Sequence, residues 1–392
     1  MFGRLIQSRA VRWLPLGAGA ALFGTSPAHA AAVDAHARSY SDGQASKPPR
    51  LIVSNPGTLL TCNWGYAWVT FCGHHQSPPL LTLQPADAFA RKWRKFVADG
   101  PAKLLVISDF DQTLTPFYKP GSGGRAQEPS SHGLLLAGGA LSESVAARER
   151  ELFSRYFPIE MSPKLTKEEK LPFMVEWWTQ AHELLVESRL TRAHIREAVA
   201  LAGLSFRPGF HALLALLSSQ QIPTLVFSAG LYDVIHEVLR AEFRAALDAD
   251  LPPNVHVVSN MMRFAADGTI EGFQGNLIHS INKNAGVVRD SPFWRQCQGE
   301  QRSNVLLLGD SRGDVMMAHG LDSADDDDRV IRVGFLNVHV EDALDEYLAL
   351  YDVVLTHDAS LEPVVMLLEQ LAAQPPAVDA AADADSKVSA TK

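Results

Sequence analysis

Three short apolar runs, at residues 104–107, 224–227 and 305–308, constrain the fold of this 392-residue chain more than any other feature. Each run is hydrophobic along its whole length, which is typical of parallel strands that helices cover on both faces of a sheet. Helical periods follow the second and third runs, at 232–246 and 313–319, so the order strand, loop, helix repeats. The sequence therefore predicts an α/β fold, with a Rossmann-like parallel sheet between helices.

Polar residues stand at the end of each run, in the stretches Asp109-Phe-Asp-Gln-Thr113, Phe227-Ser-Ala-Gly230 and Gly309-Asp-Ser-Arg-Gly-Asp314. Open α/β sheets bind their ligands at the carboxyl ends of the strands. We therefore expect these three polar clusters to form one site.

The chain divides into five predicted parts. Residues 87–119 and 221–371 form the α/β core, and residues 120–220, with helical periods at 141–157, 166–186 and 191–201, form an inserted helical cap. Residues 34–86 show no sustained period and are interpreted as a linker or an unexplained segment. The Ala- and Asp-rich residues 372–392 are typical of a disordered tail.

The first 33 residues contain no Asp or Glu but carry Arg4, Arg9 and Arg12 before an apolar, small-residue stretch. This composition predicts a targeting segment, either a mitochondrial or plastid presequence or a secretory signal, with an untargeted tail as the alternative. The apolar stretch is too short to span a bilayer, so no stable membrane insertion is expected.

Composition excludes several classes of protein. The hydrophobic fraction of 46% is that of a folded chain, and the net charge of -9 argues against binding a nucleic-acid polymer. The three cysteines show no metal-ligand spacing and cannot all pair, so a reducing compartment fits best. An anionic substrate would therefore need a local cationic pocket.

Asp109 and Asp111 stand two residues apart where the first apolar run opens into a loop. One carboxylate can attack a phosphorus atom, and a second can transfer the proton of the leaving group. The alternative is that both simply cap a turn, as Asp often does at strand ends.

The second and third clusters supply candidate anion and metal ligands. Ser228 and the backbone of Ala229 precede a helix and could hold phosphate oxygens, although a Ser helix cap with a Gly turn explains them equally. Asp310 and Asp314, together with Asp109, would suit a hard cation such as Mg²⁺, unless they only form a turn.

Lys283 lies between the second and third apolar runs. A single Lys is usually a solvated surface residue, but a site with several carboxylates and a phosphate needs a fixed cation to balance its charge. Lys283 is the best-placed candidate for that cation.

The order of Asp109-Phe-Asp-Gln-Thr113, Ser228, Lys283 and Gly309-Asp-Ser-Arg-Gly-Asp314 resembles the four motifs of the haloacid dehalogenase superfamily. More narrowly, residues 87–371 resemble the class III cytosolic (pyrimidine) 5′-nucleotidases, through Phe173-Met-Val-Glu-Trp177, Val257-Val-Ser-Asn260, Leu277-Ile-His279 and Leu307-Leu-Gly-Asp310.

This resemblance implies a role for each residue of the core. Asp109 would be the nucleophile and Asp111 the acid and base, while Ser228 and Lys283 would clamp the phosphate. Mg²⁺ would bind Asp109, the backbone carbonyl of Asp111 and Asp310, with Asp314 supporting the metal site.

The resemblance also assigns residues of the cap. Glu160 falls where the family has a base-reading glutamate, and His132 and Trp178 fall where rings flank the base. Ala181 stands where relatives carry a Ser that touches the nucleotide, which leaves the nucleotide preference open.

The sequence thus predicts a Mg²⁺-dependent 5′-nucleotidase that hydrolyses nucleoside 5′-monophosphates, favouring pyrimidines, through an aspartyl phosphate. The alternatives are a phosphatase for another small phosphomonoester and a catalytically silent nucleotide-binding protein. The resemblance implies a protein that acts in the cytoplasm, and we expect a monomer. The composition of residues 1–33 favours a different location, reached by import into an organelle or by secretion.

Overall fold

The computed structural model describes residues 50–53, 60–63, 88–162, 164–247, 250–289, 291–321 and 327–373. The predicted targeting segment and most of the predicted tail lie outside these residues. Within the described part of the chain, no helix is long and apolar enough to cross a membrane.

The described residues form one nine-stranded sheet, with the strand order β2-β1-β9-β8-β7-β3-β4-β5-β6. The six strands from β9 to β5 run parallel, and antiparallel strands extend the sheet at both edges. The strands are β1 (Arg50–Val53), β2 (Leu60–Asn63), β3 (Leu104–Ser108), β4 (Thr224–Leu231), β5 (Val255–Phe264), β6 (Ile270–Gln274), β7 (Asn304–Gly309), β8 (Val330–Leu336) and β9 (Val353–Thr356). The predicted α/β fold is confirmed.

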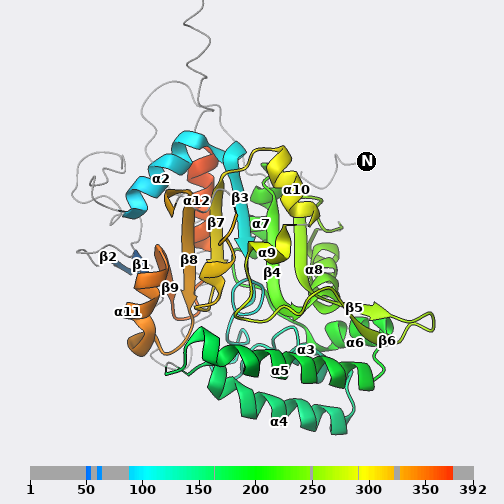
Figure 1. Ribbon diagram of the computed structural model, residues 1–392. Helices are drawn as coiled ribbons and strands as arrows, with labels where there is room; N and C mark the ends of the chain where they lie inside the picture. The colour runs from blue at the N-terminus through cyan, green and yellow to red at the C-terminus, as the bar shows by residue number, and fades with distance from the viewer. Residues whose placement is uncertain are drawn as a thin grey trace, which may run out of the picture.

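Helices cover both faces of this sheet (Figure 1). Alternating residues of β3 show the two layers: Leu104 and Val106 pack into one apolar cluster, and Leu105 and Ile107 pack into another. The helices are α2 (Ala88–Asp99), α3 (Gly133–Ala137), α4 (Glu143–Glu160), α5 (Lys167–Glu187), α6 (Arg192–Ala202), α7 (Phe210–Ser219), α8 (Tyr232–Leu247), α9 (Ala285–Val288), α10 (Pro292–Gly299), α11 (Val340–Leu350) and α12 (Glu362–Ala372).

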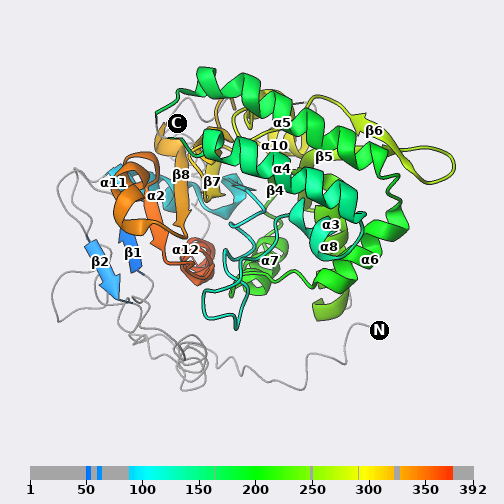
Figure 2. The same ribbon diagram turned by 90° about the horizontal axis from the view of Figure 1, so that it is seen from below.

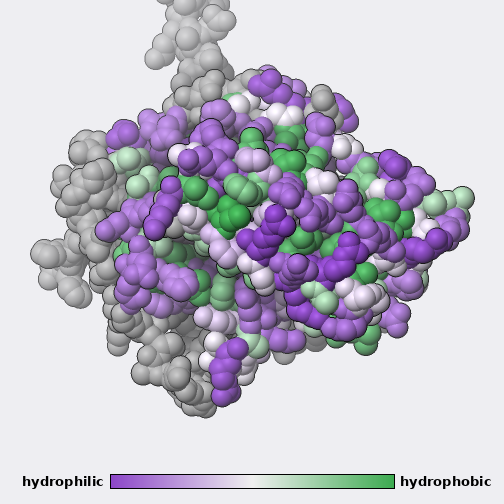
Figure 3. All heavy atoms as spheres, turned by 60° about the horizontal axis from the view of Figure 1, so that its bottom comes forward, coloured by the Kyte–Doolittle hydropathy of each residue, from purple (hydrophilic) through white to green (hydrophobic). Residues whose placement is uncertain are grey.

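The two longest helices of the insertion, α4 and α5, lie across the carboxyl ends of the strands (Figures 1 and 2). Ser142 caps α4, and α5 begins with a capping box in which Thr166 and Glu169 bond each other's backbone amides. The surface seen from this side is mainly hydrophilic, with separate hydrophobic areas (Figure 3). These helices therefore cover the edge of the sheet where the polar clusters lie.

Three local features differ from the sequence-based expectation. The segment 34–86, whose sequence shows no helical or strand period, nevertheless contains β1 and β2. β1 pairs antiparallel with β2 and with β9, so the pairing and not a local pattern accounts for these strands. α7, inside the predicted cap range, buries Phe210, Leu213 and Leu217 in a cluster with β3. The helix predicted at 313–319 is only a 3₁₀ turn at Asp314–Met316.

Candidate active site

Three adjacent strands bring the predicted core residues together. β3 lies between β7 and β4, so Asp109 follows the central strand, Asp310 follows one neighbour, and Ser228 lies in the other. After β3 the chain adds β4 on one side of it and later returns to add β7 on the other side. Open α/β sheets bind their ligands at such a change of direction.

Asp109, Asp310 and Asp314 form an acidic cluster in which one oxygen of each carboxylate lies within 4.8 Å of the others. The buried Lys283 Nζ lies 2.7 Å from Asp109 Oδ1 and 2.5 Å from Asp314 Oδ1. Thr113 donates a 3.2 Å hydrogen bond to Asp310 Oδ1. One ammonium group thus holds two of the three carboxylates, and Asp310 has no described cation partner.

Burial and charge crowding shift the pKa values of this cluster. Burial raises the pKa of Asp109 to about 7, against the lowering effect of Lys283. Burial, followed by Asp314 and Asp109, raises the pKa of Asp310 well above its ordinary value. Burial alone would lower the pKa of Lys283, but the two carboxylates raise it overall. The cluster has an excess of negative charge, which a bound cation would offset.

Asp314 fixes the geometry of its own loop. Its Oδ2 accepts hydrogen bonds from the backbone amides of Asp310 and Ser311 at 3.1 and 2.9 Å and from the Ser311 hydroxyl at 2.8 Å. A Cβ on Gly309 would lie 2.3 Å from the Asp314 Cβ, so only glycine fits there. This network orients the backbone that carries Asp310.

Asp111 points away from the acidic cluster, toward the insertion. Its two carboxylate oxygens accept hydrogen bonds from the amide and hydroxyl of Ser131, at 2.7 and 2.8 Å. Burial raises the pKa of Asp111, while the Ser131 hydrogen bonds lower it. A Cβ on Gly230 would lie 1.9 Å from the Ser131 hydroxyl, so the glycine makes room for this contact. Ser131 was not a predicted site residue.

The predicted phosphate-binding residues Ser228 and Ala229 lie in the last part of β4, which is held from several sides. Ser228 Oγ accepts a 3.0 Å hydrogen bond from the Gly230 amide. The buried Asn260 side chain donates to the carbonyls of Ala229 and Ile278, at 2.7 and 2.8 Å. Asn260 therefore ties the last residues of β4 to the segment that leads to Lys283.

Two cap residues reach the core. Trp178 of α5 donates its indole N–H to the Ala229 carbonyl at 3.2 Å. Glu160, the last residue of α4, lies beside Ser280 in the loop before Lys283. Burial raises the pKa of Glu160, against the lowering effect of the nearby Lys170 ammonium. The structure thus places both residues next to the loops of the core site.

A stack of rings continues from the site toward β6. The His132 ring lies parallel to that of His182 with centroids 6.1 Å apart, and His182 stacks on Phe273 at 3.7 Å. The Nε2 atoms of both histidines are buried without a partner among the described residues. Ala181 lies in the apolar cluster between α4 and α5, so its contact with a nucleotide stays a prediction.

Arg207, which the sequence analysis did not single out, is buried under the loop that carries Asp109 and Asp111. Its guanidinium donates to the carbonyls of Gln112 and Thr113, at 2.6 and 2.8 Å. It also binds Asp358 Oδ1 at 2.7 Å, and Asp358 accepts the amides of residues 117 and 118. One arginine thus fixes the loop that follows β3 to the residues just after β9.

A parallel sheet with Asp109 at its central strand, Lys283 and Asp310 beside it and a helical insertion above it defines a phosphatase of the haloacid dehalogenase superfamily. Residues 112–372 match the model of the pyrimidine 5′-nucleotidase family (UMPH-1). The chain belongs to this family.

Individual relatives support this assignment. The chain is 39% identical over 272 residues to the 7-methylguanosine phosphate-specific 5′-nucleotidase of Mus musculus, covering 69% of this chain and 86% of the relative. It is 36% identical over 286 residues to a putative cytosolic 5′-nucleotidase 3 of Caenorhabditis elegans, covering 72% of each.

A solved structure gives the same result. The crystal structure of cytosolic 5′-nucleotidase IIIB bound to cytidine superimposes with a TM-score of 0.60 at 32% identity, covering 72% of this chain and 91% of that one. The predicted superfamily and family are confirmed, and the chain is a 5′-nucleotidase, a phosphoric monoester hydrolase.

Proposed function

We propose that this 5′-nucleotidase hydrolyses nucleoside 5′-monophosphates in two steps, with Mg²⁺, through a phosphorylated Asp109. The observation that carries the proposal is the ion pair between Lys283 and Asp109, inside a cluster of three carboxylates at the ends of adjacent strands. A fixed cation beside a nucleophilic carboxylate offsets the charge of an incoming phosphate.

The donor set suits Mg²⁺. Asp109 and Asp310 offer carboxylate oxygens, the ligands that this hard cation prefers. Burial and then the neighbouring carboxylates raise the pKa of each, and a bound cation would stabilise their charged forms. The backbone carbonyl of Asp111 would complete the protein ligands, with Asp314 fixing the loop. The bound ion would supply electrostatic stabilisation of the transferring phosphoryl group.

In the first step, an Asp109 carboxylate oxygen bonds to phosphorus while the bond from phosphorus to the nucleoside O5′ breaks. Asp111, whose raised pKa favours a proton on its carboxyl group, gives that proton to O5′. In the second step, a water oxygen attacks the phosphorus, Asp111 takes the water proton, and the bond to Asp109 breaks. The products are nucleoside and inorganic phosphate.

Lys283, the Ser228 hydroxyl and the Ala229 amide would hold the phosphate oxygens between these steps. Lys283 is already oriented by Asp109 and Asp314, and the backbone next to Ser228 is fixed at the Ala229 carbonyl by Asn260 and Trp178. Groups that are held in place before the substrate binds lose little free energy to reorganisation during the reaction.

The cap would read the base. Glu160 can accept hydrogen bonds from an exocyclic amine or a ring N–H, and the Trp178 indole offers a stacking surface. Two substrate classes fit: the pyrimidine monophosphates of the family description, and 7-methylguanosine monophosphate, which the mouse relative's name specifies. N7-methylation gives guanine a positive charge, which a carboxylate and an indole both favour.

One assay tests the proposal: phosphate release from CMP, UMP, GMP, 7-methylguanosine monophosphate, glucose 6-phosphate and phosphoserine, with Mg²⁺ and with EDTA. We expect both CMP and 7-methylguanosine monophosphate to exceed the two non-nucleotides, and EDTA to abolish all turnover. Equal rates for all the substrates would contradict base reading, and full activity in EDTA would contradict the metal.

We also propose that the protein acts in the cytoplasm, as the names of two relatives, both called cytosolic, support. Import directed by residues 1–33 is the alternative. Localising the full chain and a variant lacking residues 1–33 distinguishes the two, because only a targeting segment would change location on deletion.

A further inference from the structure

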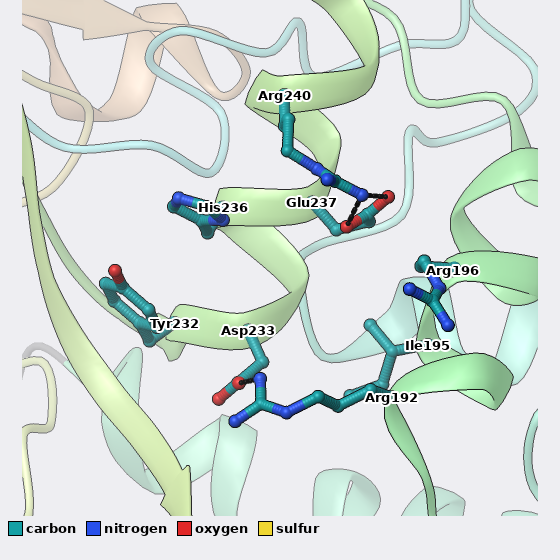
Figure 4. Close-up of a pocket in the computed structure, with 8 residues that line it drawn as sticks. All are labelled: Arg192, Ile195, Arg196, Tyr232, Asp233, His236, Glu237 and Arg240. Atoms are coloured by element: carbon teal, nitrogen blue, oxygen red, sulfur yellow. Dashed lines mark hydrogen bonds and ion pairs between the residues drawn. The ribbon is translucent and has the colours of Figure 1, made fainter. Parts of the chain in front are cut away.

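A cavity of about 360 Å³ lies between α6 of the insertion and α8 of the core (Figure 4). Its lining consists of Arg192, Ile195, Arg196, Tyr232, Asp233, His236, Glu237 and Arg240. None of these residues is among the proposed catalytic, metal or base-reading residues. The volume lies in the range of small-molecule sites.

The charges of this cavity do not balance. Arg192 binds Asp233 at 2.9 Å, and Arg240 binds both oxygens of Glu237 at 3.0 and 2.9 Å (Figure 4). Arg196 makes no hydrogen bond or ion pair with any described residue. Each acid thus has its own arginine, and one guanidinium remains without an anionic partner.

Hydrogen-bond donors also exceed acceptors. A guanidinium carries five N–H donors, whereas the bonds from Arg192 to Asp233 and from Arg240 to Glu237 each use a single nitrogen. The rest can serve a ligand together with Arg196. A ligand with several anionic oxygens would therefore be bound best, and phosphate groups match guanidinium geometry.

Arg192 is held in place before any ligand binds. Asp233 is buried and also accepts the Met262 amide at 2.9 Å, so it cannot leave Arg192 easily. Arg192 stacks on the Phe264 ring, with its guanidinium carbon 4.1 Å from the centroid. On the opposite side, the Tyr232 and His236 rings stack at 5.5 Å and form an aromatic wall.

We propose that this cavity is a second ligand site, which binds a phosphate-rich small molecule of nucleotide size. The phosphates contact Arg196 and the free donors of Arg192 and Arg240, and an attached ring lies against Tyr232 and His236. Because Tyr232 begins α8 directly after β4, an occupant bridges the insertion and the strand that carries Ser228.

The test measures binding of ATP, pyrophosphate and adenosine to the full chain by calorimetry in EDTA, which removes divalent cations. We expect ATP and pyrophosphate to bind and adenosine not to bind. Arg196→Ala should weaken ATP binding by roughly 10-fold or more, since it removes charge-assisted hydrogen bonds. It should leave CMP turnover in Mg²⁺ without ATP unchanged.

Arg244→Ala is the matched control, because Arg244 is an exposed arginine of α8 that pairs with Asp250 and does not line the cavity. It should bind ATP as the wild type does. Hydrogen exchange locates the ligand: ATP should slow exchange in α6 and α8. The proposal is wrong if ATP does not bind at millimolar concentration, if both arginine variants bind it equally, or if protection appears only at 104–115 and 304–314.

Discussion

Lys283 and Asp109 form a buried ion pair, with the ammonium nitrogen 2.7 Å from Asp109 Oδ1 and each side chain at most 10% exposed. Truncating one partner of such a pair leaves the other charge uncompensated, which typically costs about 3–5 kcal/mol. Lys283→Met should therefore lower the thermal midpoint of the metal-free protein, because Asp109 and Asp314 then repel each other. Added Mg²⁺ should recover part of the loss, as a thermal melt with and without Mg²⁺ would detect.

The same variant should lose turnover even when it is folded. Removing one electrostatic donor to a transition state typically costs roughly 10²–10³ in kcat. We expect a decrease of this size for Lys283→Met at saturating CMP and Mg²⁺. A variant with wild-type kcat would show that Lys283 only balances charge in the resting protein.

The two aspartates of the first cluster should differ when each becomes asparagine. Asp109→Asn should abolish turnover with the fold intact, because an amide cannot form the phosphoenzyme. Asp111→Asn keeps the nucleophile and the Ser131 contacts in part, so it should turn over slowly and improve with better leaving groups. Burst kinetics with p-nitrophenyl phosphate distinguishes the two variants. If Asp111→Asn slows turnover equally for all leaving groups, Asp111 does not transfer the proton.

Arg207 acts through the loop it holds, so it is expected to be a positioning residue. Arg207→Lys cannot reach Gln112, Thr113 and Asp358 together, because Lys lacks the planar fork. The variant should lower kcat for CMP and for p-nitrophenyl phosphate by the same factor, roughly 10-fold or more, with little change in KM. Arg302→Lys, another arginine bound to backbone carbonyls but remote from the site, should lower stability without lowering kcat.

These residues show what local sequence can and cannot predict. Asp109, Ser228 and Asp310 were found because each directly follows an apolar run, and parallel strands place such positions together. Ser131 and Arg207 follow no such run, and their partners lie 20 and 94 or more residues away in the chain. Only the folded chain brings them together, as it does for the edge pairing of β1 with β9.

His132 and His182 should make stability depend on pH. Burial lowers their pKa values to about 4 and about 3, from an ordinary value of 6.5. Between pH 6.5 and these values the unfolded chain binds more protons than the folded chain, so stability decreases as pH falls. Each histidine contributes up to about 1.4 kcal/mol per pH unit.

Chemical denaturation at pH 7 and pH 5 measures how the free energy of unfolding changes with pH. His182→Gln, which cannot be protonated in this range, should reduce the difference between the two pH values. His194→Gln, at an exposed position of α6, should not. If the unfolding free energies of the wild type and of His182→Gln change equally between the two pH values, His182 is not held neutral in the folded protein.

The last prediction separates a nucleotidase from a general phosphatase and depends on Glu160. Its carboxylate lies beside Ser280, at the junction of cap and core, and it can accept hydrogen bonds from a base but not from a bare phosphate. Losing a buried hydrogen-bond partner costs about 1–3 kcal/mol, so Glu160→Ala should lower kcat/KM for CMP by roughly 5- to 150-fold.

A substrate without a base provides the control. Hydrolysis of p-nitrophenyl phosphate by Glu160→Ala should hardly change, because Glu160 is not placed among the residues that handle the phosphate. Glu160→Gln removes only the negative charge, so it should reduce activity toward the cationic 7-methylguanosine monophosphate more than toward neutral-base CMP. If Glu160→Ala lowers turnover of p-nitrophenyl phosphate and CMP alike, the residue supports the loop at Ser280 and the base must be read elsewhere.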